Sequence, residues 1–241
     1  MGDKEEIPNV GDLIEMFPNV EKLALSRDLV PFKKINLDTL KSFTLNAYHN
    51  ANLANAPKNH LWLREQVMPN VEFFRSFIKQ QADDFCGIAP ENLPNLKWLE
   101  CEMDNKKSML KTIQSFKNVT ALRASNVGKQ DIFDAFENRL QILSISGRFA
   151  GFPMQKISSQ TTLEILYING YKQEFNMEWL LNLKLKEIQL LNCPKVINAE
   201  ALLEMDCLES LFIMNCKNAL SAELKLKLKE RKFAHLNIDF T

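Results

Sequence analysis

Residues 163–168, 185–190 and 208–213 read LEILYI, LKEIQL and LESLFI, and these three stretches decide the fold. In each of them apolar residues occupy the first, fourth and sixth positions. One such match is weak in a chain that is 46% hydrophobic, but matches that recur after 22 and 23 residues indicate an internal repeat. A repeat of this size cannot bury its own apolar side, so the sequence predicts a protein built by stacking similar units.

The first apolar residue of each copy serves as an anchor for following the repeat along the chain. Successive anchors are 20 to 25 residues apart, except for one gap of 31. This spacing falls within the period of leucine-rich repeats, which is about 20–29 residues. A phrase of the type Phe17-Pro18-Asn19 precedes four anchors, at Val20, Val71, Leu96 and Val119. The ten anchors are Val20, Leu40, Val71, Leu96, Val119, Leu140, Leu163, Leu185, Leu208 and Phe233.

Each anchor is expected to begin a short strand whose third and fifth following residues face the core. Leu166 and Ile168 are examples. Helical periodicity between the strands predicts short amphipathic helices at residues 132–136, 178–181 and 199–205. Asn198 is the expected N-cap of the helix at 199–205, and Ser221 that of a last convex helix that follows it. The predicted fold class is α/β, a horseshoe-shaped solenoid of about ten repeats with a parallel concave sheet and convex helices.

The repeat predicts a single domain over residues 1–241. An N-terminal cap is expected at about residues 1–19 and a C-terminal repeat at about residues 221–241. The gap of 31 places an irregular, longer repeat at about residues 46–70. Its Asn-rich sequence is interpreted either as a functional loop or as an ordinary convex helix that follows a longer loop.

The later repeats carry a cysteine three residues after the sixth position, at Cys193 and Cys216. The pattern resembles the leucine-rich-repeat superfamily over nearly the whole chain, and residues 185–197 and 208–216 resemble the cysteine-containing repeats of F-box substrate receptors. The resemblance implies a binding scaffold, with substrate recognition for a ubiquitin ligase as its narrower form. It also implies an F-box, which we expect on another chain because the repeats begin by about residue 7; otherwise the chain is a repeat-only fragment or protein.

Composition narrows the expected partners and compartment. Lys plus Arg and Asp plus Glu each number 30, so the chain has no general attraction for nucleic acid or anionic membranes. No apolar stretch reaches the roughly 18 residues of a spanning helix, and the N-terminus lacks a signal-peptide core. Five widely spaced cysteines indicate free thiols in a reducing compartment. The sequence therefore predicts a cytoplasmic or nuclear protein that is not secreted.

Motifs for catalysis are missing from the sequence. It contains no nucleophile elbow, phosphate-binding glycine loop, paired-histidine metal motif or calcium loop. We therefore expect no enzyme activity, catalytic residue, metal or cofactor. Cys193 and Cys216 lie one repeat apart and should stack, and we interpret them as buried thiols that contact the turn backbone rather than as a metal or redox pair.

The strand face opposite the core is the expected binding site. Side chains alternate along a strand, so residues two, four and six positions after each anchor should face solvent. Large apolar residues interrupt this face, which is typical of an interface, although a register error, a covering loop, tight curvature or a self-dimer would hide them. Phe73, Arg75 and Phe77 extend the set if the repeat at Val71 is correctly phased. The predicted partner-binding residues are Trp98, Arg123, Ile142, Ile165, Tyr167, Gln189, Leu191, Phe212 and Met214.

These observations predict a module that binds another protein on its concave face, with neither nucleic acid nor membrane as a partner. The alternative is a structural or regulatory subunit. Such a subunit would assemble, with itself or with other chains, through its convex helices or through the terminal repeat edge near residues 233–240.

Overall fold

The structure, a computed structural model, describes residues 15–26, 37–46, 64–76, 88–103, 107–129, 131–149, 151–217 and 219–238. Most of the predicted cap and of the irregular repeat, together with Phe77, lie outside these ranges. The contacts within the chain divide it into two compact units. Unit 1 comprises residues 1–101 and 115–118, and unit 2 comprises residues 102–114 and 119–241. The single-domain organisation stays a prediction.

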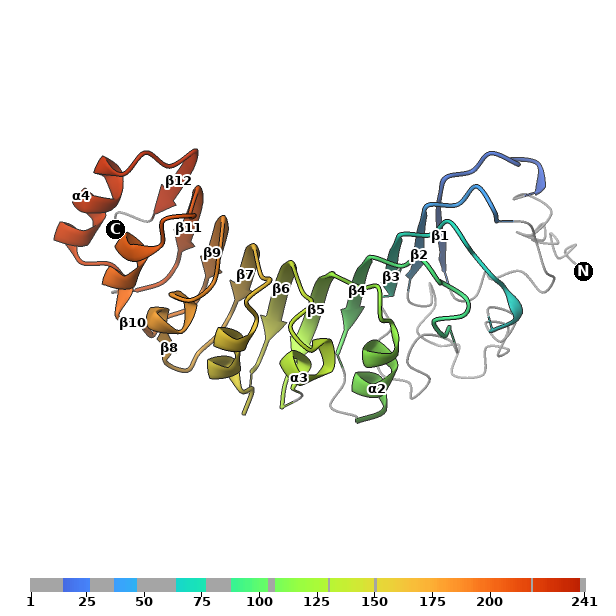
Figure 1. Cartoon of the computed structure of the whole chain (residues 1–241), viewed down its shortest axis with the longest axis horizontal. Helices are drawn as coiled ribbons and strands as arrows, with labels where there is room; N and C mark the ends of the chain where they lie inside the picture. The colour runs from blue at the N-terminus through green and yellow to red at the C-terminus, as the bar shows by residue number, and fades with distance from the viewer. Residues whose placement is uncertain are drawn as a thin grey trace, which may run out of the picture. The chain divides into compact units, whose positions relative to one another are not determined.

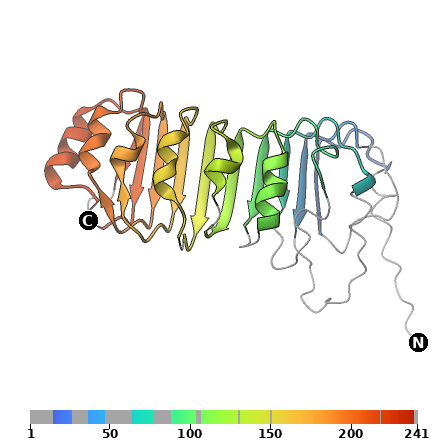
Figure 2. The same cartoon turned by 60° about the horizontal axis from the view of Figure 1, so that its bottom comes forward.

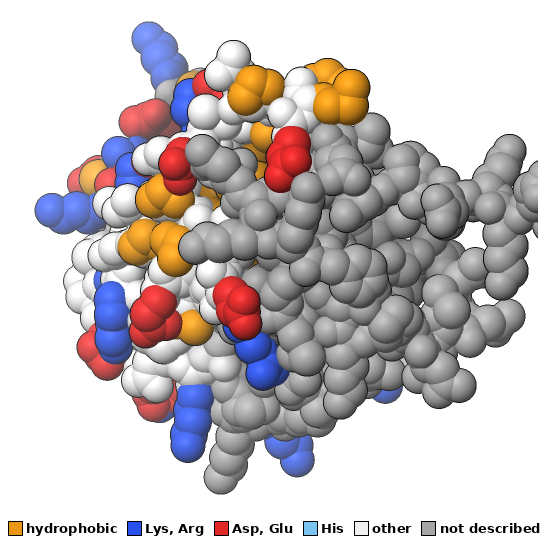
Figure 3. Space-filling view, turned by 90° about the vertical axis from the view of Figure 1, so that its right-hand side faces the viewer, with side chains coloured by type: hydrophobic (Ala, Val, Ile, Leu, Met, Phe, Trp, Pro, Cys, Tyr) orange, Lys and Arg blue, Asp and Glu red, His pale blue; other side chains and the backbone are white. Residues whose placement is uncertain are grey.

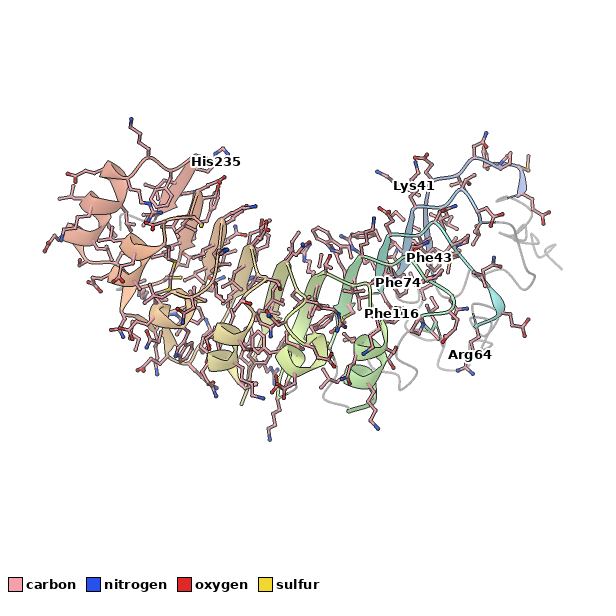
Figure 4. The ribbon with its side chains drawn as sticks, in the orientation of Figure 1. Lys41, Phe43, Arg64, Phe74, Phe116 and His235 are labelled. Atoms are coloured by element: carbon pink, nitrogen blue, oxygen red, sulfur yellow. The ribbon has the colours of Figure 1, made fainter. Side chains whose placement is uncertain are left out.

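Unit 1 contains parallel strands that pair in chain order (Figure 1). Their bounds are β1 Lys22–Ser26, β2 Ser42–Asn46, β3 Phe73–Ser76 and β4 Trp98–Glu102. Phe43 of β2 and Phe74 of β3 stack on the core side of this sheet, with ring centroids 5.8 Å apart and ring planes at 12° (Figure 4). Both rings are fully buried, so contact between neighbouring repeats supplies the core here.

Unit 2 contains a larger parallel sheet in the order β5-β6-β7-β9-β11-β12. A second, two-stranded parallel sheet pairs β8 with β10. The mixed α/β class and the parallel pairing are thus confirmed. The bounds are β5 Ala121–Val127, β6 Ile142–Gly147, β7 Ile165–Asn169, β8 Phe175–Asn176, β9 Glu187–Leu191, β10 Val196–Ile197, β11 Ser210–Met214 and β12 His235–Ile238.

The predicted register is confirmed in both units. Every one of the ten long strands begins two residues after its anchor, and residues at equal distance from their anchors lie side by side. The exception is the end of β5, where the register shifts and Val127 pairs with Gly147. The third and fifth residues after each anchor are buried, as at Leu166 and Ile168. The sole departures in the described repeats are at the ends of the chain, where Leu23 and Leu236 are half-buried. The larger apolar side chains at even positions are half-buried, whereas the small Ala121 is buried.

The chain leaves most strands of unit 2 through the same left-handed turn position, seven residues after the anchor. The backbone has a positive φ there at Asn126, Asn192 and Asn215, each with φ 54°, and at Gly170 and Gly147, with φ 86° and 152°. Asn and Gly are the residue types that adopt this conformation at low cost. At Gly147 space also matters, because a Cβ would lie 2.4 Å from the backbone nitrogen of Val127.

The recurring asparagine before the anchor connects each repeat to the one before it. The amide nitrogens of Asn95 and Asn118 donate to the carbonyls of Pro69 and Pro94 at 2.9 and 2.8 Å. Asn70 makes the same bond to the repeat before it. These bonds satisfy carbonyls at the turn into the strand, which explains why the phrase recurs.

The first residue after the anchor forms ion pairs between neighbouring repeats. Lys41 binds Glu21 at 2.6 Å and Lys97 binds Glu72 at 2.7 Å in unit 1 (Figure 4). Lys186 binds Glu164 at 2.7 Å in unit 2. All of these side chains are more than 40% exposed, so each pair contributes little stability.

Helical segments return the chain from one strand to the next. Their bounds are α2 Lys107–Ser115, α3 Ile132–Phe136, η3 Met154–Ser159, η4 Met177–Leu180, η5 Ala199–Glu204 and α4 Ala222–Glu230. The prediction at residues 132–136 is confirmed. The segments at η4 and η5 are helical but adopt the tighter 3₁₀ form, which covers more distance per residue in a short connection.

The two predicted N-caps differ in outcome. The Ser221 hydroxyl accepts a hydrogen bond from the Leu224 amide at 3.1 Å, so this cap is confirmed. The Asn198 prediction is wrong in its capping bond, because Asn198 has left-handed backbone angles and caps no amide. Its side chain instead donates to Asn176 of the preceding repeat at 3.2 Å.

The helical segments of unit 2 lie on one side of its long sheet, as Figures 1 and 2 both show. An aromatic series that includes Phe149 and Tyr171, with centroids 5.2 Å apart, fills this side. Among the described residues no helix covers the opposite face of the sheet. We call that face the strand face of unit 2.

Candidate functional site

Eight of the nine predicted binding residues lie on the strand face of unit 2. They occupy three rows that run across the strands, at two, four and six positions after the anchors. Tyr167, Gln189 and Phe212 are consecutive members of the middle row, since their strands pair in register. Neighbouring strands are about 4.8 Å apart, so side chains within a row are in reach of one another. The flanking rows contain Ile142 and Ile165 on one side and Leu191 and Met214 on the other.

These apolar side chains are half-buried rather than fully open, which sharpens the predicted stripe. Arg123, at the start of the middle row, is exposed. In the described parts of the chain, the large apolar side chains that are highly exposed lie outside the strand face of unit 2. They are Met16, Phe17, Val67 and Leu226. Figure 3 shows hydrophobic groups on the surface at the end of unit 1.

Tyr167 is held in place by an acidic neighbour. Its hydroxyl donates to Oε1 of Glu187 on the adjacent strand at 2.9 Å. Burial and the Glu187 carboxylate raise the pKa of Tyr167 to about 12. The phenol is therefore neutral at physiological pH, and the ring has a fixed orientation at the centre of the face.

Trp98, the ninth predicted residue, lies in unit 1 in a cluster of its own. Its ring centroid is 6.2 Å from that of Phe73, and the Arg75 guanidinium lies 5.4 Å from the centre of the Phe73 ring. Arg75 Nε also donates to Glu100 Oε2 at 2.5 Å, and Glu100 is 3% exposed. The pairing of Phe73 with Trp98 confirms the phase of the repeat at Val71. The Trp98 indole nitrogen is buried and makes no hydrogen bond within the described structure.

The two stacked cysteines contact the turn backbone, as the sequence predicts. Cys193 Sγ donates to the Leu191 carbonyl at 3.2 Å, and Cys216 Sγ donates to the Met214 carbonyl at 3.3 Å. Cys216 Sγ also accepts from the Cys193 amide at 3.3 Å. The Cys216 thiol and burial raise the pKa of Cys193, so it remains a protonated, poorly nucleophilic thiol. In the described ranges no group of three or more His, Cys, Asp or Glu residues could hold a metal ion.

A small hollow lies in unit 1 at the turns that lead into β4 and out of α2. Its volume is about 280 Å³, and Leu93, Pro94 and Phe116 line it together with Glu91 and Lys117. It contains no histidine or cysteine. The hollow is therefore a surface depression, and its lining residues do not form a catalytic acid–base pair.

Basic residues in the turns after the strands of unit 2 are a feature that the sequence reasoning missed. One exposed Lys or Arg occurs eight to ten residues after each of five successive anchors. The repeat itself supplies the signal, because aligning the copies brings these residues within three neighbouring positions of the repeat. The residues, which we call the outgoing-turn cations, are Lys129, Arg148, Lys172, Lys195 and Lys217.

Comparison of the chain with protein-family models and with curated proteins gives no match. None of the described helices has both the length and the apolar character needed to cross a membrane.

Proposed function

We propose that this chain is a leucine-rich-repeat solenoid that binds another protein through the strand face of unit 2. One observation carries the proposal. Apolar side chains of adjacent, registered strands lie together on a face that no described helix covers. The core-facing side chains of the same strands are already buried by stacking of the repeats. Folding alone therefore gives no reason for apolar residues on the strand face.

The form of the face suits a binding platform. Tyr167 and Phe212 flank Gln189 in the middle row, and buried aromatic residues are frequent hot spots of protein interfaces. The strands and the Tyr167–Glu187 hydrogen bond fix the side chains before a partner arrives. Little conformational entropy is then lost on binding.

The narrower form of the proposal is a substrate receptor of a ubiquitin ligase in the cytoplasm or nucleus. The thiol contacts of Cys193 and Cys216 support it, because they match the turn role of cysteine that the resemblance implies. The described cysteines form no disulfide bond with one another, which suits a reducing compartment. Enzyme activity is not part of the proposal.

A site-specific photo-cross-linker tests the binding face directly. Benzoylphenylalanine at Gln189 sits between Tyr167 and Phe212 and should cross-link a partner in native cells, with the partner identified by mass spectrometry. The matched control carries the same group at Leu226, which is 61% exposed on α4. A partner captured equally well from both positions, or from Leu226 alone, would contradict the proposed face.

Charged substitutions provide the second arm. Tyr167→Asp with Phe212→Asp should reduce recovery of the cross-linked partner at least tenfold, because both changes place a carboxylate in the apolar contact. Leu226→Asp should leave recovery unchanged. Circular dichroism and thermal melting must show that all variants keep the fold. Unchanged recovery by the folded double variant counts against the proposal.

Assembly through the terminal repeat is the second candidate. Strand β12 pairs with β11 and has no second partner among the described residues, which leaves a strand edge open. His235, at the start of this strand, is exposed (Figure 4). Mass measurement by light scattering across a wide concentration range tests self-assembly: a mass that rises with concentration supports it, and a constant monomer mass contradicts it.

A further inference from the structure

The outgoing-turn cations form a basic border along one edge of the strand face of unit 2. Parallel strands end at the same edge of a sheet, so residues that follow them gather there. The five cations come from five successive repeats and are all exposed. Neighbouring repeats are about 5 Å apart, a spacing at which like charges repel. This arrangement of like charges does not stabilise the folded chain.

Few carboxylates neutralise this border. The same turns carry two acidic residues, Asp131 and Glu174. Asp131 is already engaged, because Lys156 binds its carboxylate at 2.5 Å. Lys172 donates to the Asn192 carbonyl at 3.2 Å, which holds its ammonium group at the turn without cancelling its charge. Within the described structure Arg148, Lys195 and Lys217 make no ion pair.

The border begins a few residues after the last apolar row, at the edge where the strands end. Leu191 and Met214 form the row nearest the strand ends. Lys195 follows Leu191 by four residues, and Lys217 follows Met214 by three. A chain that lies across these strands would therefore meet apolar side chains on one side and cations on the other.

We propose that the partner segment on the strand face of unit 2 is an acidic peptide segment of a protein, with apolar side chains on the rows and Asp or Glu carboxylates on the outgoing-turn cations. This inference rests on the proposed function and specifies its partner. The charge of the border selects carboxylates, and the apolar rows select Leu-type or aromatic side chains.

A polyanion without apolar groups fits this surface less well. A nucleic-acid backbone would satisfy the cations but would leave Ile142, Ile165 and Phe212 against sugar and phosphate. Glu187 also lies on the same face, beside Tyr167, and would repel phosphate. The chain as a whole has a formal net charge of zero, so it has no long-range attraction for polyanions.

Fluorescence polarisation with the full chain tests this partner class. The probes are short fluorescein-labelled peptides: Leu alternating with Glu, Leu alternating with Gln, Ser alternating with Glu, and Leu alternating with Lys. A mixed-sequence single-stranded RNA is the fifth probe. We expect the Leu–Glu peptide to bind most tightly, and its affinity to fall as salt is raised from about 0.05 to 0.5 M because exposed ion pairs are screened.

Charge reversal assigns the binding to the border. Arg148→Glu, Lys195→Glu and Lys217→Glu together should weaken binding of the Leu–Glu peptide at least about tenfold, since three exposed ion pairs are lost and replaced by repulsion. The matched control is Lys111→Glu, Lys184→Glu and Lys232→Glu, which changes the net charge equally at exposed positions outside the border. This control should bind within about twofold of the unaltered chain.

The outcomes separate this inference from the function on which it rests. If the Leu–Gln peptide binds as tightly as the Leu–Glu peptide, and binding depends on Tyr167 and Phe212, the strand face is a binding site but the acidic partner is wrong. If RNA binds most tightly and the border variant loses it, the partner is a nucleic acid and the inference is overturned. If the Leu–Glu peptide does not bind, the inference also fails, whereas the cross-linking from Gln189 decides the proposed function separately.

Discussion

The Tyr167 phenol shows how one residue couples the strand face to the stability of unit 2. Its pKa of about 12, set by burial and by Glu187, exceeds the ordinary tyrosine value of about 10. The folded state therefore favours the protonated phenol. This contribution to stability is complete below about pH 10 and is lost as the pH rises through about 12.

We therefore expect the free energy of unfolding to fall more steeply between about pH 10 and 12 in the unaltered chain than in Tyr167→Phe. Urea unfolding at several pH values measures the two slopes. The expected difference approaches about 1.4 kcal/mol per pH unit at most. Parallel slopes would show that Tyr167 ionises in the folded chain as it does in the unfolded one.

Two glycines of unit 2 offer a matched test of backbone packing. In Gly147→Ala the new Cβ would meet the Val127 backbone at 2.4 Å, and backbone cannot move aside. We expect a loss of about 3 kcal/mol or more in thermal or urea unfolding. Gly151→Ala also has an unfavourable φ, 71°, but its Cβ would meet only the flexible Lys129 side chain at 3.5 Å. Its expected loss is about 1 kcal/mol, and equal losses would contradict the role assigned to the close approach.

At the scale of elements, α4 depends on its cap more than η5 does. Ser221→Ala removes the bond to the Leu224 amide and should cost about 1 kcal/mol in unfolding free energy. Asn198→Gly keeps the left-handed conformation and removes no capping bond, so its expected change is within about 0.5 kcal/mol. Chemical denaturation of both variants checks this difference, and a larger loss at Asn198 would contradict it.

The strands could be predicted from the sequence because their signal is periodic. Ten anchors place ten strands and their register, and a buried position such as Leu166 tolerates no shift by one residue. The helical segments carry a weaker signal. A run such as residues 199–205 is apolar on one side in either helical form, so the pattern does not distinguish an α-helix from the 3₁₀ helix that forms there.

The position of the candidate site could be predicted from the sequence, but the packing, hydrogen bonds and charges of its side chains could not. Alternation places Ile165 and Phe212 on the strand face, yet only the folded structure shows that both side chains are partly buried there. The Tyr167–Glu187 bond joins residues 20 apart that the sequence alone does not pair. The outgoing-turn cations escape a search for motifs because each repeat contributes a single Lys or Arg at a slightly different position.

At the scale of the whole molecule, stability in a stacked chain depends on the number of neighbours a repeat has. Strand β7 pairs on both sides, whereas β12 pairs with β11 alone among the described residues. We expect amides of β12 to exchange with solvent at least about tenfold faster than those of β7, as hydrogen-exchange mass spectrometry would measure.

Two core variants test the same idea. Ile188→Ala in β9 should cost about 2–5 kcal/mol and raise exchange in β7 and β11, because Ile188 is fully buried between two neighbours. Ile238→Ala in β12 should raise exchange mainly in β12. A uniform rise across unit 2 in the second variant would show that the repeats unfold as one cooperative body.

The ion pairs after the anchors have a consequence for folding itself. Where this position is charged, the sign alternates: Glu21, Lys41, Glu72 and Lys97 in unit 1, and Glu164, Lys186 and Glu209 in unit 2. The other three repeats have uncharged residues there, Thr120, Gln141 and Ala234. A chain that skipped one repeat while stacking would still match apolar anchors, since all repeats look alike to the core. It would, however, set glutamate against glutamate and lysine against lysine, at a cost of about 0.2–1 kcal/mol each. Bonds too exposed to strengthen the finished fold can thus keep its repeats in sequence order.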